Sequence, residues 1–124
     1  MPDRILGTTR SESIRKRFQI AAAMLGGKRD ILSVGSHETG IISEVELSAS
    51  SIRRFLSYLT EEGYVSLDYI SAWRAPHAAW WPNHIEYTFT ETGKRFLETE
   101  LKAWSESQKY DYMLGERVRA LLIT

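Results

Sequence analysis

The sequence predicts an α+β domain that is mainly α-helical, and three observations lead to this prediction. Apolar side chains recur at steps of three and four residues over 14–25, 52–59 and 96–104, which is the spacing of amphipathic helices. Two short stretches, 64–70 and 85–90, alternate in polarity and are rich in strand-forming residue types. With 124 residues, of which 43% are hydrophobic and 26% charged, the chain has the composition of one globular domain.

Composition excludes several classes of protein. The chain has no cysteine, so it has no disulfide framework, cysteine-based zinc site, iron–sulfur cluster or thiol nucleophile. No apolar run approaches the roughly 18–20 residues that span a bilayer, and residues 1–7 lack the apolar stretch of a signal peptide. We therefore expect a cytoplasmic protein with no membrane partner. Sixteen basic and sixteen acidic residues give zero net charge, which argues against a sequence-indifferent nucleic-acid coat.

The basic residues are concentrated near the N-terminus. Residues 1–29 hold seven Lys or Arg and two Asp or Glu, a net charge of +5, whereas residues 30–62 carry a net charge of −4. Two interpretations remain open: a solvated helix face, or a patch that contacts phosphates. The basic residues concerned are Arg4, Arg10, Arg15, Lys16, Arg17, Lys28 and Arg29.

The N-terminal part of the chain predicts a flexible arm followed by a helix. Residues 1–10 offer little to bury, so they are assigned to the arm. Residues 9–12 have the spacing of a capping box, so a helix should begin there. The Gly26-Gly27 pair should end it. The apolar pair Ile31-Leu32 either extends this helix or forms a separate short one.

A short helix, a tight turn and a second helix are expected next. The apolar residues of 39–45 predict a brief helix of two turns. Residues 46–48 form a tight connection, after which Ser48 or Ser50 can cap the second helix. That helix should stop at Gly63, since glycine is favoured just after a helix C-terminus.

The two predicted strands most simply pair as a hairpin with a long tip, and a long helix should follow. Gly115 either kinks or ends this C-terminal helix. The domain boundaries are then 11–92 for the helices and hairpin, and 93–124 for a C-terminal dimerisation helix. A small core cannot cover a helix reaching residue 122, so a twofold homodimer is the economical arrangement.

This order of elements is the layout of a winged helix-turn-helix module. In that module the second helix of the pair can enter the DNA major groove, and the hairpin, or wing, can touch the flanking backbone. At 100° per residue, the apolar side chains of 48–62 fall on one arc. Small hydroxyl groups and two arginines project elsewhere, which suits a groove-facing surface but is also ordinary for an exposed helix face. The outward residues are Ser50, Arg53, Arg54, Ser57 and Glu61.

Two segments resemble known families. Residues 39–65, TGIISEVELSASSIRRFLSYLTEEGYV, resemble the helix-turn-helix stretch of archaeal winged-helix regulators, in which a Leu-Ser turn leads into a helix that ends at a glycine followed by a hydrophobic residue. Residues 87–97, YTFTETGKRFL, are similar to the junction after the wing in MarR-like and PadR-like families. The resemblance covers residues 14–104 and implies a transcriptional regulator that binds double-stranded DNA. By position it implies DNA contacts from Ser48, Ser50, Ser51, Arg53, Arg54 and Ser57, and wing contacts from Trp73, Arg74 and His77.

The expected hairpin tip contains three tryptophans, Trp73, Trp80 and Trp81. An exposed apolar patch of that size usually marks a contact site. The tryptophans either pack on the protein's own core or across a dimer, bind a partner protein, or stack on bases or a small molecule. The alternative function is therefore a protein–protein interaction module that uses this tip. A ligand-sensing regulator with an aromatic cavity between the wing and the last helix is a third hypothesis.

The sequence offers no catalytic or metal-binding pattern. His77 and His84 match no standard metal-ligand spacing. No serine lies in the context of a nucleophile elbow, and Gly26-Gly27-Lys28 lacks the spacing of a phosphate-binding loop. We therefore expect neither an enzyme nor a cofactor-dependent protein.

Overall fold

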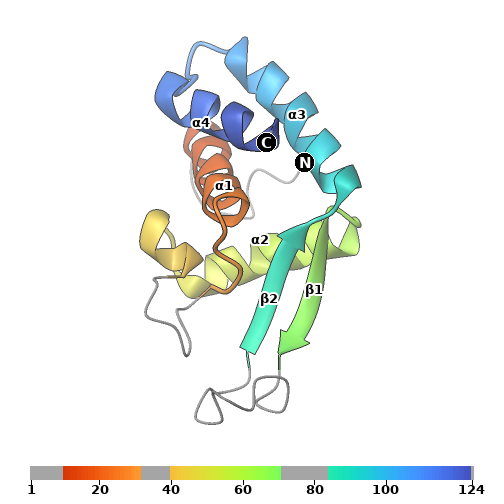
Figure 1. The fold of residues 1–124 in the computed structure, drawn as a ribbon. Coiled ribbons are helices and arrows are strands. Elements are labelled where there is room, and N and C mark those ends of the chain that lie inside the picture. Colours follow the sequence, from red (N-terminus) through yellow and green to blue (C-terminus); the bar gives the residue numbers. More distant parts are fainter. Residues whose placement is uncertain (1–9, 32–39, 71–83, 124) are drawn as a thin grey trace.

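A computed structural model describes residues 10–31, 40–70 and 84–123. Within these ranges it contains four α-helices, one 3-10 helix and a two-stranded antiparallel sheet, so the prediction of a mainly helical α+β protein is confirmed (Figure 1). The elements, in chain order, are α1 (Arg10–Leu25), η2 (Ile41–Glu44), α2 (Ala49–Glu61), β1 (Val65–Ile70), β2 (His84–Phe89), α3 (Glu91–Ser105) and α4 (Tyr112–Leu122).

Helix α1 begins and ends where the sequence predicts. It starts at Arg10, and Gly27 adopts a φ of 114°, a left-handed conformation that ends helices at little steric cost for glycine. The helix does not continue past the glycines. Ile31 is buried in a bend, and its carbonyl accepts a hydrogen bond from the Ile42 N–H at 3.0 Å. This contact holds the end of the α1 loop against η2.

The predicted two-turn helix over 39–45 is shorter than expected. Only the single turn of η2 forms, because Val45 already has the extended φ of −132°. The Ser43 hydroxyl donates to the Gly40 carbonyl at 2.7 Å and closes the turn. Three of the residues in this segment are β-branched and apolar, and such residues favour extended backbone.

Helix α2 is capped by Ser48 rather than Ser50. The Ser48 side chain accepts a hydrogen bond from the Ser51 N–H at 3.2 Å. At the other end, Gly63 has a φ of 79°, and the Tyr64 N–H bonds back to the Leu59 carbonyl. The helix is therefore bounded by the two signals that the sequence offered.

Strands β1 and β2 pair antiparallel, from Val65 opposite Phe89 to Ile70 opposite His84, which confirms the predicted hairpin. The hairpin projects away from the helices (Figure 1). Its tip, residues 71–83, lies outside the described residues.

The prediction of one long C-terminal helix is wrong, because α3 ends at Ser105 and α4 begins at Tyr112. The hydroxyls of Ser105 and Ser107 donate to backbone carbonyls three residues earlier, which competes with helical hydrogen bonding. Asp111 then caps the new helix by accepting from the Leu114 N–H at 3.1 Å. Gly115 does not end a helix, since it lies within α4.

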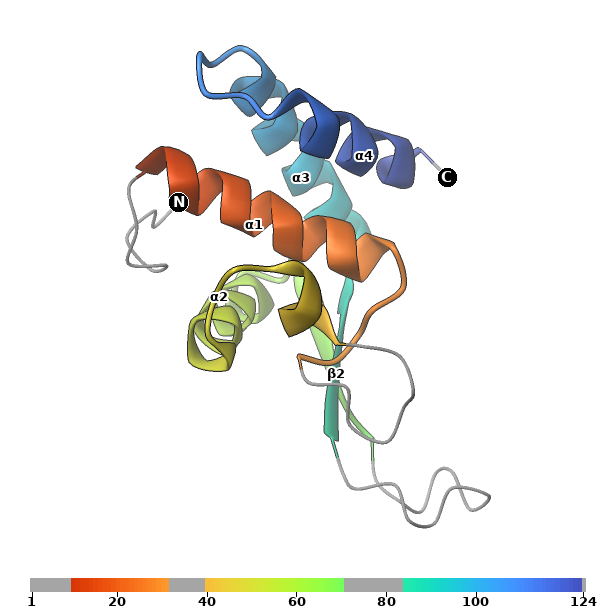
Figure 2. The same cartoon turned by 90° about the vertical axis from the view of Figure 1, so that its left-hand side faces the viewer.

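Helix α4 folds back along α1, and α1 lies between α4 and α2 (Figure 2). One core cluster joins α1, η2, α2 and the base of the hairpin, and a second joins α1, α3 and α4. Val118 of α4 is fully buried in the second cluster. The other large apolar residues of this segment are covered only in part: Tyr110, Leu114, Leu121 and Leu122 are partly buried against the second cluster, and Tyr112, Met113 and Ile123 are exposed. None of the helices in the described ranges is long and apolar enough to cross a membrane.

Candidate nucleic-acid interface and internal cavity

The exposed face of α2 is the first candidate site. Ile52, Phe55, Leu56 and Leu59 are all buried, as the helical periodicity predicts. Because an α-helix turns 100° per residue, the positions between them face outward. The exposed side chains of this face are those of Ser50, Arg53, Arg54, Ser57 and Glu61, and Ser51 is half-buried.

The first turn of α2 favours an anion. It contains no acidic residue, and its side chains, those of Ala49, Ser50 and Ser51, are small. Unpaired N–H groups and the helix dipole give such a terminus partial positive charge. Ser48 is exposed here as well, but its hydroxyl is engaged with Ser51, so its first role is to cap the helix.

The two arginines of α2 lie on different sides of its exposed face. Burial raises the pKa of Tyr87 on β2, and the positive charge of Arg53 partly offsets that rise. Arg53 is therefore close to the hairpin, whereas Arg54 is one residue further around the helix. Within the described residues neither guanidinium takes part in an ion pair. Both charges are thus available to an external anion.

Among the described residues near the N-terminus, three basic side chains are either close to a carboxylate or buried. Arg15 lies 4.0 Å from Glu46, and Lys28 lies 3.8 Å from Glu44. Arg17 is only 8% exposed. Its position three residues after Ile14 places it on the apolar side of α1, a signal that a count of charges along the chain overlooks.

The predicted wing residues Trp73, Arg74 and His77, together with Trp80 and Trp81, lie outside the described residues. The hairpin stem shows an apolar surface that the sequence analysis did not single out. Leu67, Tyr69 and Ile85 are exposed, although they share a strand face with the buried Val65 and Tyr87. The sequence contains a signal for this surface, because the alternation of apolar and polar residues continues along both strands beyond the part of the sheet that packs against the core. We call these three residues the hairpin patch.

His84 lies on the opposite face of the hairpin from this patch. Its Nε2 is 2.9 Å from the Glu86 carboxylate. The contact joins two residues of the same strand at a spacing of two, so both side chains are on one side of β2. The pairing of His84 with Glu86 therefore follows from their positions on the strand.

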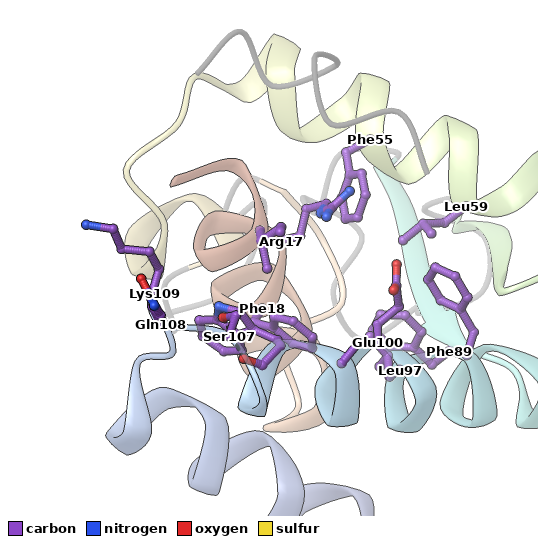
Figure 3. Close-up of a pocket in the computed structure, with 14 residues that line it drawn as sticks. Arg17, Phe18, Phe55, Leu59, Phe89, Leu97, Glu100, Ser107, Gln108 and Lys109 are labelled. Carbon is purple, nitrogen blue, oxygen red and sulfur yellow. Dashed lines mark hydrogen bonds between the residues drawn. The ribbon is translucent and has the colours of Figure 1, made fainter. Parts of the chain in front are cut away.

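A cavity of about 620 Å³ is the second candidate site, and it lies among α1, α2, β2 and α3 (Figure 3). Most of its wall is apolar, and five aromatic side chains contribute to it. The third hypothesis from the sequence was an aromatic cavity between the wing and the last helix. This cavity borders the base of the hairpin and α3, and α1 and α2 complete its wall. Its lining residues are Ile14, Arg17, Phe18, Phe55, Leu59, Phe89, Phe96, Leu97, Glu100, Ala103, Trp104, Ser107, Gln108 and Lys109.

Charges of both signs reach this cavity. Figure 3 shows the Arg17 side chain of α1 directed toward Phe55, and the Glu100 carboxylate of α3 directed toward Leu59. Both charges act on the nearby Tyr58. Burial is the main cause that raises the pKa of Tyr58, Glu100 adds to the rise, and Arg17 opposes it. The cavity wall thus carries one charge of each sign, with Lys109 as a further lining residue that is exposed.

Comparison of the chain with protein-family models, with curated proteins and with solved structures finds no match.

Proposed function

We propose that the chain is a winged-helix protein that binds double-stranded DNA sequence-specifically and acts as a small transcriptional regulator in the cytoplasm. The observation that carries this proposal is the exposed face of α2, with two arginines that form no ion pair within the described residues and a row of serines. The one-turn helix η2 precedes α2 and the hairpin follows it, the order of a winged helix-turn-helix.

The chemistry of α2 suits the major groove. An arginine can donate two parallel hydrogen bonds to guanine or bind a phosphate. Serines allow close approach and donate to phosphates. Glu61 and Glu62 lie at the C-terminal end of α2, where they would repel phosphates, so the N-terminal half of the helix enters the groove. Arg53, which is beside the hairpin, then lies between the bases and the wing.

A homodimer remains part of the proposal. Two copies of α2 related by a twofold axis would read two half-sites about one DNA turn apart. Tyr112 and Met113 at the start of α4 remain exposed and offer an apolar contact. Sedimentation should give twice the chain mass of 14.3 kDa, in the free protein or on a palindromic duplex. A single chain on every selected duplex would contradict this part.

The decisive experiment compares two double variants on duplexes selected from a random library. Arg53→Ala with Arg54→Ala removes the two arginines of α2. Arg95→Ala with Arg119→Ala removes two exposed arginines of α3 and α4, with the same change in net charge. The first variant should lose at least tenfold in affinity and remain folded, and the second should bind like the unmodified chain.

The salt dependence of binding gives an independent measure. Each phosphate contact that is lost reduces the slope of log affinity against log salt by about 0.9. If the α2 variant bound as tightly as the control variant, DNA recognition through this helix would be wrong.

The hairpin patch supports a second candidate function, a protein–protein interaction module. Leu67, Tyr69 and Ile85 continue the apolar face of the sheet toward the tryptophan-bearing tip. A protein that works in this way would bind no duplex even at low salt. Its capture of a partner would depend on Tyr69 together with Trp73, Trp80 and Trp81, and would be insensitive to the loss of Arg53 and Arg54.

A further inference from the structure

We propose that the cavity among α1, α2, β2 and α3 binds an uncharged, planar molecule of two or three aromatic rings. The volume of about 620 Å³ lies within the range of small-molecule sites, roughly 300–1,000 Å³, and is far larger than a packing defect. This inference goes beyond DNA binding and does not depend on it.

The walls set the shape of the ligand. Phe18 and Trp104 stack with their ring centroids 4.6 Å apart and their planes 7° from parallel, and both line the cavity. Phe55 of α2, Phe89 of β2 and Phe96 of α3 contribute further aromatic surface. Aromatic rings gain most from stacking or edge contacts with other rings, so a flat aromatic body is the best match.

The charges set the polarity of the ligand. Arg17 and Glu100 enter the cavity from facing helices with opposite sign, and Lys109 stands at the exposed rim, where solvent screens it. An anion would be attracted by Arg17 and repelled by Glu100, and a cation the reverse, so neither sign of charge has a clear electrostatic gain. An ionised group would nevertheless lose its hydration on entering a mostly apolar cavity, and an uncharged molecule avoids that penalty.

Two fluorescent probes with the same ring system test the proposal. N-phenyl-1-naphthylamine is uncharged, and 8-anilinonaphthalene-1-sulfonate adds a negative charge. Both fluoresce more strongly in apolar surroundings. Both can also be excited directly, without exciting the tryptophans of the protein. The uncharged probe should bind in a 1:1 ratio and at least tenfold more tightly than the sulfonate. Absence of binding, or equal or tighter binding of the sulfonate, would overturn the proposal.

A pair of alanine variants locates the probe. Ala103 lies on α3, lines the cavity and is exposed, so Ala103→Trp narrows the cavity without filling the core. Ala120→Trp places the same side chain at an exposed position of α4 that does not line the cavity. Both variants should melt like the unmodified chain. Ala103→Trp should weaken probe binding at least tenfold, and Ala120→Trp should leave it unchanged; equal behaviour of the two would place the probe elsewhere and refute the site.

Discussion

The rings of Phe18 and Trp104 stack 4.6 Å apart and join α1 to α3. Trp104 also contacts Tyr110 edge-on, with 4.9 Å between centroids, just before α4 begins. One buried aromatic ring thus connects the first helix with the two C-terminal helices. We therefore expect the packing of the C-terminal third to depend on Trp104.

Loss of the Trp104 ring should therefore destabilise the whole chain. We expect Trp104→Ala to lower the free energy of unfolding by about 3–5 kcal/mol, the usual cost of removing a buried large aromatic side chain. Trp104→Phe retains a ring and should cost less. Glu98→Ala, at an exposed residue of the same helix, is the control and should change stability by less than about 0.5 kcal/mol. Urea denaturation measures all three, and a loss below about 1 kcal/mol for Trp104→Ala would contradict this role.

Gly93 has no room for a side chain. It lies in the first turn of α3, where a Cβ atom would meet the carbonyl oxygen of Tyr64. Alanine normally stabilises a helix relative to glycine by up to about 1 kcal/mol. Here we expect the opposite sign, a loss of about 1–3 kcal/mol, because backbone must move to admit the methyl group. Thermal denaturation of Gly93→Ala beside Thr92→Ala, an exposed neighbour, measures the effect; a stabilised Gly93→Ala chain would disprove the close approach.

The cap of α2 should be measurable with two serines that are two residues apart. Ser48→Ala removes the side-chain acceptor of the Ser51 N–H and should cost about 1 kcal/mol. Ser50→Ala removes an exposed hydroxyl within the helix and should be neutral or slightly favourable. Denaturation of the two variants gives the difference directly. Equal effects would mean that Ser48 does not cap the helix.

Stability should fall at alkaline pH, and Tyr87 should contribute to the fall. Burial raises the pKa of Tyr87 above its ordinary value near 10. The folded state then holds its phenolic proton more tightly than the unfolded state, so this contribution is complete below pH 10 and is lost as the pH rises through the folded pKa. Denaturation between pH 8 and 11 should show a shallower decline for Tyr87→Phe. Arg53→Ala should steepen the decline, since it removes the charge that favours the phenolate.

Local signals in the sequence predicted the boundaries of α1 and α2 and the hairpin. For α2, the apolar spacing, the Ser48 cap and Gly63 all act within one or two helical turns, so they can be seen without tertiary structure. The break before α4 depends on competition between serine hydroxyls and helical hydrogen bonds over residues 105–111. The apolar spacing of Leu97, Leu101 and Trp104 contains no information about that competition.

The two candidate sites differ in the same way. The exposed face of α2 is a property of one helix, and its outward residues could be predicted from periodicity alone. The cavity is formed by elements that lie up to about ninety residues apart, from Ile14 to Lys109, so no local pattern announces it. A count of basic residues along the chain groups Arg17 with exposed side chains, whereas its spacing after Ile14 places it on the buried side of α1.

Arg54 and Phe55 are consecutive residues of α2, yet one faces solvent and the other lines the cavity. A duplex on the exposed face and a small molecule in the cavity would therefore both contact α2, a helix of thirteen residues. Any influence between them is symmetric by thermodynamic necessity. If a molecule in the cavity changes the affinity for a duplex by a given factor, the duplex changes the affinity for that molecule by the same factor.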